Sequence, residues 1–121
     1  MDSERTDQQA TVLVIDDEPA ICRVVTHTLE RNGFRVQSVS AADQLEAAIE
    51  RLDYQIVLLD RSIDGEKGLN LVALLRQRLP RAKIFYFTGE FVESDELEQV
   101  DGVVQKPVNG KQLTQTLRAA L

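Results

Sequence analysis

The strongest constraint on the fold is a regular alternation along the chain. Short apolar runs rich in β-branched residues are each followed by a segment in which apolar positions recur at helical spacing. Three of these runs are uninterrupted, at residues 12–15, 56–59 and 84–87. Continuous hydrophobicity is typical of strands covered by helices on both faces, as in a parallel sheet. We therefore predict that these runs are the central strands of an α/β domain.

Two weaker runs complete the predicted sheet. Residues 34–38 alternate like a half-exposed strand, and the short run 102–105 comes directly before Lys106. Both are expected at the sides of the sheet. Five strand–helix pairs in succession predict a doubly wound parallel sheet, whose functional crevice lies beyond the carboxyl ends of the strands.

The helices are predicted from apolar stripes and end signals. The first begins at Pro19 and stops at Asn32-Gly33, where a left-handed residue is expected. Ser40 is predicted to cap the second helix and Asn109 the last. Residues 93–98 leave room for only about two turns, so the fourth helix is expected to be short. The stripe predicted for the first helix consists of Ile21, Val24, Val25, Thr28 and Leu29.

Length and charge limit the possible functions. A chain of 121 residues fits one domain, which we place at residues 11–121 after a disordered polar tail at 1–10. Twenty acidic and fourteen basic residues give a net charge of −6, which argues against direct nucleic-acid binding. No apolar run is long enough for a membrane helix, and the chain begins unlike a signal peptide, so a cytoplasmic location is expected. The single Cys22 cannot form an internal disulfide and is expected to be a small packing residue beside the apolar stripe of the first helix.

Residues able to do chemistry follow the predicted strands. Asp16 and Asp17 come after the first strand, Asp60 after the third, Thr88 after the fourth and Lys106 after the fifth. A helix cap would explain one of the two acids that follow the first strand, but not both together with Asp60. Carboxylates held close together repel each other unless a cation neutralises them, and Mg²⁺ prefers such oxygen ligands. The sequence therefore predicts a Mg²⁺ site at this edge of the sheet.

A cation and a hydroxyl are expected beside these acids. Lys106 would supply positive charge opposite the carboxylates, and Thr88 would add an uncharged donor, which completes a pocket for an anionic group. A metal ion, an ammonium group and a hydroxyl together suit a phosphoryl group. Because carboxylates act as nucleophiles when aspartyl phosphates form, the predicted chemistry is phosphoryl transfer onto Asp60.

The ordered motifs resemble those of a known family. Val-Leu-Val-Ile-Asp-Asp-Glu-Pro at 12–19, Ile-Val-Leu-Leu-Asp at 56–60, Phe-Thr-Gly at 87–89 and Lys-Pro at 106–107 look like the receiver domain of bacterial two-component response regulators. The resemblance covers about residues 11–121. It implies a flavodoxin-like fold with strand order 2-1-3-4-5 and a phosphoryl group accepted on Asp60. The implied donor is a phosphohistidine on a sensor histidine kinase or a histidine phosphotransfer protein.

The same resemblance implies a role for each site residue. Asp17 would bind Mg²⁺ through its carboxylate, Asp16 largely through water, Asp60 directly and Ser62 through its main-chain carbonyl. Lys106 would pair with the phosphoryl oxygens, and Thr88 would bond to one of them. The resemblance also implies a signalling domain rather than an enzyme, which assists its own phosphorylation and dephosphorylation and acts on an unknown output protein through altered contacts.

Several positions depart from the usual family pattern. Asp64 stands where many receivers have proline, and Val103 stands where a switching aromatic residue is frequent. The segment between Thr88 and Lys106 is short, which alters a face that many receivers use for dimerisation or output. Its acidic stretch, residues 90–101, is expected to be a solvated loop, with a docking surface for a basic partner as the alternative.

Two other interpretations stay open. A pseudo-receiver would bind partners without being phosphorylated; the departures at Asp64 and Val103 favour it, and the intact acidic, threonine and lysine positions oppose it. The chain is also compatible with a receiver excised from a hybrid histidine kinase, although Met1 and the polar tail favour a stand-alone protein. A phosphohydrolase of the haloacid dehalogenase type is not expected, because Ser62 stands where those enzymes have a second acid. Nucleotide or flavin binding fits poorly, because the loop after the first strand is acidic.

Overall fold

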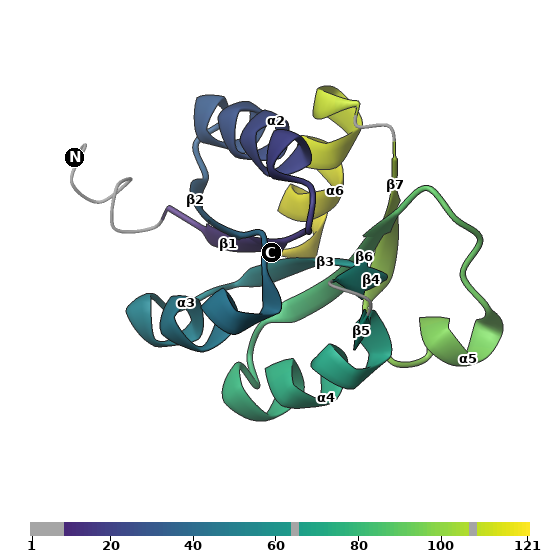
Figure 1. Cartoon of the computed structure of the whole chain (residues 1–121). Coiled ribbons are helices and arrows are strands. Elements are labelled where there is room, and N and C mark those ends of the chain that lie inside the picture. Colours follow the sequence, from purple (N-terminus) through teal and green to yellow (C-terminus); the bar gives the residue numbers. More distant parts are fainter. Residues whose placement is uncertain (1–8, 64–65, 107–108) are drawn as a thin grey trace.

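The computed structural model describes residues 9–63, 66–106 and 109–121. The described residues form a five-stranded parallel sheet, and three of its strands lie where the uninterrupted apolar runs were predicted. In chain order its strands are β1 (Thr11–Ile15), β2 (Arg35–Val39), β3 (Ile56–Asp60), β6 (Lys83–Thr88) and β7 (Gly102–Gln105). Their order across the sheet is β2-β1-β3-β6-β7 (Figure 1). This is the predicted order 2-1-3-4-5, with the two weaker strands at the sides.

Helices cover both faces of the sheet. One face packs against α2 (Pro19–Arg31) and α6 (Gly110–Ala120), and the other against α3 (Leu45–Arg51) and α4 (Gly68–Arg78) (Figure 1). Because successive strand residues point to opposite faces, each central strand contributes to both apolar cores. In β1, for example, Leu13 packs toward α3 and α4 while Val14 packs toward α2 and α6, and both are fully buried. Burial on both faces accounts for the uninterrupted apolar runs.

The first helix ends as predicted, but its buried stripe differs at one position. Gly33 has a φ of 92°, the left-handed conformation expected there. Val24 was predicted to face the core and is instead 54% exposed. Cys22 is buried in its place, because the helix is turned so that the thiol donates hydrogen bonds to the carbonyl oxygens of Asp16 and Val39.

The predicted cap of the second helix is wrong. A 3₁₀ turn, η1 (Ala42–Gln44), precedes α3, and Ser40 lies outside both elements. The side-chain oxygen of Gln44, the last residue of this turn, accepts a hydrogen bond from the Ser40 backbone amide. Asn109, by contrast, caps α6 as predicted, with its side chain accepting from the Gln112 amide at 3.1 Å.

The connections after β3 and after β6 differ from the prediction. After β3 the chain forms a small antiparallel hairpin, β4 (Ser62–Ile63) and β5 (Glu66–Lys67), which was not predicted. The fourth helix, α5 (Ser94–Leu97), has four residues and is shorter than the expected two turns. The departure at Asp64 and most of the predicted tail lie outside the described residues, so the tail and the boundary at residue 11 stay predictions. Within the described ranges, no helix combines the length and apolarity needed to cross a membrane.

Candidate functional site

The predicted site residues meet at the carboxyl edge of the sheet. Asp16 directly follows β1, Asp60 is the last residue of β3, Thr88 is the last residue of β6, and Lys106 directly follows β7. These strands run parallel and are neighbours in the sheet, so residues at their carboxyl ends share one rim. The chain segments that supply the site are therefore far apart in sequence and adjacent in space.

Asp16 is held at this rim by two hydrogen bonds. Its side chain is fully buried, and its Oδ1 accepts a hydrogen bond of 3.0 Å from the Glu18 amide at the start of α2. Its own amide donates to the Val39 carbonyl of the neighbouring strand at 3.0 Å. Asp16 therefore accounts for the helix cap that was predicted for one of the two acids, because it accepts a hydrogen bond from an amide at the N-terminus of α2. The second carboxylate oxygen is left for other partners.

Three carboxylates form one cluster. Asp16, Asp17 and Asp60 each place a carboxylate oxygen within 4.8 Å of those of the other two. Asp16 is buried, the Asp60 side chain is 15% exposed, and Asp17 is exposed to solvent. The cluster therefore has an open side and a closed side. Like charges at this separation repel each other unless a cation compensates them.

Lys106 supplies part of that compensation. Its Nζ lies 2.7 Å from Asp16 Oδ2 and 3.9 Å from Asp60 Oδ1, and 5.0 Å from the centre of the Phe87 ring. Asp16 Oδ2 is buried and makes no well-directed hydrogen bond within the described residues, so the short contact is an ion pair. Burial lowers the pKa of Lys106, but Asp16, then Asp60 and Glu18, outweigh it, so the pKa is raised overall and the lysine carries a proton at neutral pH.

The charge balance and donor set of the cluster fit a hard divalent cation. Three carboxylates and one ammonium group leave a net charge of about −2 in the cluster. Carboxylate oxygens open to water on one side are the ligands that Mg²⁺ uses in proteins, because it keeps several of its own waters. Asp16, Asp17 and Asp60 are the residues that would hold it.

Thr88 is tied to Lys106 through the backbone. Its side chain is 2% exposed, and its hydroxyl oxygen accepts a hydrogen bond of 3.0 Å from the Glu90 amide. The Lys106 amide donates to the Thr88 carbonyl at 3.0 Å. Since a hydroxyl that accepts a hydrogen bond can still donate its own hydrogen, Thr88 can bond to an anionic group at the rim.

The other predicted positions have different outcomes. Ser62 begins the β4–β5 hairpin two residues after Asp60, and its predicted carbonyl role stays a prediction. Val103 lies in β7 opposite Tyr86 and is partly buried against the core between the sheet and α3 and α4. Cys22 is buried, as expected of a packing residue. The acidic stretch 90–101 is more than a solvated loop, because two of its acids form ion pairs with arginines outside it.

One of those arginines was missed by sequence reasoning. Arg61 follows Asp60 directly, and its guanidinium forms two hydrogen bonds to the Glu96 carboxylate, of 2.9 and 2.7 Å. The sequence signal was a cation next to the predicted phosphoacceptor and an acid-rich segment without a base. Pattern alone does not indicate which acid a surface arginine contacts 35 residues away.

Comparisons with known proteins agree with this geometry. The sequence matches the family model described as the response regulator receiver domain over residues 12–118. The hydrogenase transcriptional regulatory protein HoxA of Cupriavidus necator is 32% identical over an alignment that covers 96% of this chain and 25% of HoxA. The chain spans between 18% and 50% of the length of the curated relatives it matches.

Solved structures share the fold. The chemotaxis protein CheY4 of Vibrio cholerae superposes with a TM-score of 0.84 at 23% identity, over 93% of this chain and 99% of that one. The response regulator TrrA of Thermotoga maritima, solved in complex with Mg²⁺-BeF, gives a TM-score of 0.82 at 23% identity, over 93% and 100%. Fold, strand order and family match agree: the chain belongs to the response regulator receiver domains of two-component systems.

Proposed function

We propose that Asp60 of this receiver domain accepts a phosphoryl group in a Mg²⁺-dependent reaction. The observation that carries the proposal is the meeting of Asp16, Asp17 and Asp60 within reach of the Lys106 ammonium group at one rim. The proposed donor is a phosphohistidine on a sensor histidine kinase or a histidine phosphotransfer protein. The likeness in fold to TrrA, whose structure holds Mg²⁺-BeF, supports the choice of metal and of a phosphate-like ligand.

The chemistry is a transfer between a nitrogen and an oxygen. An Asp60 carboxylate oxygen forms a bond to phosphorus while the phosphorus–nitrogen bond of the donor breaks, and the imidazole nitrogen keeps the electron pair. Lys106 neutralises charge on the transferring oxygens, and the Thr88 hydroxyl donates to one of them. A Mg²⁺ ion held by the carboxylate cluster would supply further neutralisation of this charge. The partly exposed side of Asp60 leaves room for the donor.

The metal ligands are proposed residue by residue. Asp17 and Asp60 would bind Mg²⁺ directly, Asp16 largely through water, and Ser62 through its main-chain carbonyl. The buried position of Asp16, already bonded to an amide and to Lys106, supports its indirect role. Ser62 and Glu90 are proposed to adjust the lifetime of the phosphoryl group, because both lie close in sequence to the residues that would hold it.

Signalling is proposed to occur in the cytoplasm through altered protein contacts of the receiver domain, residues 11–121. The phosphoryl group on Asp60 is proposed to be transient, because the domain assists its own dephosphorylation. The relatives are transcriptional regulators of which this chain matches a part, so in a longer protein the output would reach DNA through another segment. The expectation that nucleic acid is not bound directly therefore concerns the receiver itself, whose net charge is −6. A place within a hybrid histidine kinase would be compatible with the same chemistry.

Incubation with acetyl phosphate tests the proposal. In the presence of Mg²⁺, the intact mass of the chain is expected to increase by one phosphoryl group, because the carboxylate cluster then has its counter-ion. The same incubation with EDTA is expected to give no increase. An unchanged mass under both conditions would contradict the proposal and favour the pseudo-receiver, and equal incorporation in EDTA would contradict the role of the metal.

A further inference from the structure

The Lys106 side chain crosses a strand to reach the carboxylate cluster. Lys106 follows β7, the outer strand of the sheet, whereas Asp60 ends β3 and Asp16 follows β1. In the strand order β6 lies between β7 and β3, so the lysine side chain passes over the end of β6. This side chain is only 19% exposed, so protein atoms line most of its path. The residues at the end of β6 therefore determine where the ammonium group can lie.

The ring of Phe87 lies on this path. Phe87 precedes the last residue of β6 and is the direct partner of Asp60 in β3. Paired residues of neighbouring parallel strands point to the same face of the sheet, so the ring and the Asp60 side chain share one face. The Lys106 Nζ lies over the ring, 5.0 Å from its centre, and 3.9 Å from Asp60 Oδ1. The ammonium group therefore contacts an aromatic face beside the proposed phosphoacceptor.

This contact meets the conditions for a cation–π interaction. The face of an aromatic ring carries partial negative charge and attracts an ammonium group that lies within about 6 Å of the ring centre. The attraction is stronger where water is excluded, and Phe87 is fully buried. The ring therefore attracts the Lys106 charge from the side of β6, while Asp16 attracts it from the side of β1.

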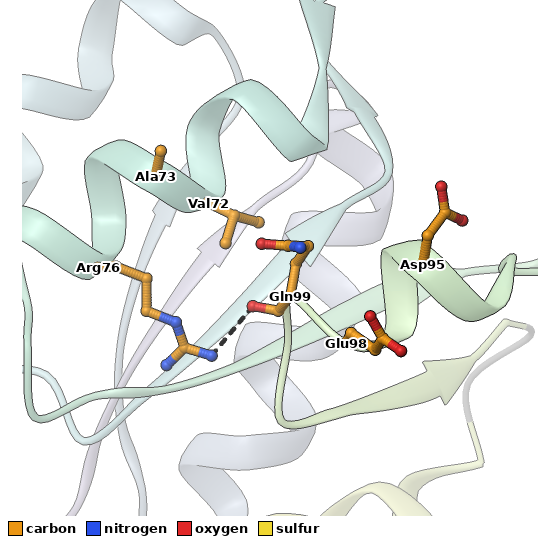
Figure 2. A pocket seen from close by; sticks show the side chains of 6 residues that line it. All are labelled: Val72, Ala73, Arg76, Asp95, Glu98 and Gln99. Atoms are coloured by element: carbon orange, nitrogen blue, oxygen red, sulfur yellow. Dashed lines mark hydrogen bonds between the residues drawn. The ribbon is translucent and has the colours of Figure 1, made fainter.

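A neutral ring has a different effect at this position from an acid. Arg76 of α4 is held in the usual way, by an ion pair with Asp101 at 3.1 Å and by the Gln99 carbonyl at 3.1 Å, beside a pocket between α4 and α5 (Figure 2). A further acid beside Lys106 would add a fourth negative charge to the carboxylate cluster and would compete for the ammonium hydrogens. The ring attracts the same cation without either effect, so these hydrogens stay available for phosphoryl oxygens.

Phe85 provides a matched comparison within the same strand. It lies two residues before Phe87, so both rings point to the same face of the sheet and pack into the same apolar core. Within the described residues, no cation lies over the Phe85 ring, which is 7% exposed. The two positions therefore share strand, face and core, and they differ in the contact with Lys106.

We propose that Phe87 is a positioning residue for phosphoryl transfer, whose ring holds the Lys106 ammonium group beside Asp60. Without the ring, the nearest attraction is Asp16 Oδ2, at 2.7 Å, which draws the ammonium group away from Asp60. The charge on the transferring oxygens would then be neutralised only after the lysine had moved back, and this slows the transfer. The inference rests on the proposed phosphorylation of Asp60.

Fluorinated phenylalanines test the charge of the ring while its size stays nearly the same. Fluorine atoms withdraw electrons from the ring face and weaken its attraction for a cation. The rate of phosphorylation by acetyl phosphate and Mg²⁺, followed by intact mass, is expected to fall with each fluorine added at position 87. For trifluorophenylalanine at this position the rate should be about fivefold lower than for the wild type. The same series at position 85 should change the rate by less than about 1.5-fold.

Proton NMR reports the contact itself. Protons above the face of an aromatic ring resonate upfield, so the ε-methylene protons of Lys106 are expected upfield of those of Lys111, an exposed lysine. Phe87→Leu keeps the position apolar but removes the ring, and it should remove this difference. Phe85→Leu, the matched control, should keep it. Equal Lys106 shifts in the wild type and in Phe87→Leu would overturn the proposed contact.

The outcomes distinguish this inference from the proposed function. If acetyl phosphate modifies the wild type and the chain with trifluorophenylalanine at position 87 at the same rate, the role of Phe87 is refuted and the proposed function stands. Equal slowing in the series at positions 85 and 87 would assign the effect to packing and would also refute this role. If acetyl phosphate leaves the wild type unmodified, both are refuted. If Phe87→Leu does not fold, the fluorinated series, which keeps the packing, decides the matter.

Discussion

Replacement of Asp60 by asparagine is expected to abolish phosphorylation by acetyl phosphate. Incorporation in the presence of Mg²⁺ should fall from one phosphoryl group per chain to none. The side-chain amide that replaces the carboxylate is a poor nucleophile, and it also removes one negative charge from the cluster that would hold the metal. Intact-mass spectrometry and a phosphate-affinity gel measure the loss.

Asp53→Asn is the matched control for this substitution. Asp53 is an exposed acid outside the cluster, so the change removes the same charge and should leave incorporation at the wild-type level. Circular dichroism should show that both variants are folded. Equal incorporation in Asp60→Asn and wild type would place the phosphoryl group on another residue and would remove the basis of the proposed function.

Replacement of Lys106 by methionine is expected to give the largest loss of stability. Methionine keeps most of the apolar length of the side chain but leaves the buried Asp16 Oδ2 without its cation. Breaking a buried ion pair in this way costs about 3 kcal/mol of unfolding free energy, which corresponds to a thermal midpoint lower by roughly 10 °C. Thermal unfolding in EDTA, followed by circular dichroism, measures the shift.

A control variant and the addition of Mg²⁺ show whether the loss of stability comes from the ion pair. Lys111→Met changes an exposed lysine on α6 and is expected to move the midpoint by less than about 2 °C. Addition of Mg²⁺ should recover part of the stability lost in Lys106→Met, because a bound cation compensates the same carboxylates. If the two lysine variants unfold at the same temperature in EDTA, the ion pair with Asp16 contributes no stability and this account of the site is wrong.

The central strands were predictable from sequence because their environment leaves few alternatives. A strand buried on both faces must be apolar throughout. Residues 12–15 of β1 and residues 56–59 of β3 are all apolar and fully buried. Gly33 was equally clear, since a left-handed residue after a helix strongly favours glycine. The site followed from these elements, because the positions after parallel strands necessarily share one edge.

What sequence did not predict depends on contacts between distant segments. Hydrophobicity ranks Val24 above Cys22, but the rotation of α2 on the sheet is set by packing and by carbonyl oxygens that accept from the thiol. The ion pair of Arg61 with Glu96 joins residues 35 positions apart. The choice of Glu96 as the partner depends on how the connection after β6 folds, and this connection has no regular sequence periodicity. The β4–β5 hairpin has strands of two residues each, too short to produce a sequence pattern.

Thermal unfolding of the wild type and of Asp17→Asn, each with and without Mg²⁺, tests most directly whether the acids form one cation site. For the wild type, saturating Mg²⁺ at a hundred times its dissociation constant should add about 2.7 kcal/mol of stability. Asp17→Asn should be more stable than the wild type in EDTA, because one repelling charge is gone, and should gain almost nothing from Mg²⁺. The same gain in both proteins, or no gain in the wild type, would contradict the account.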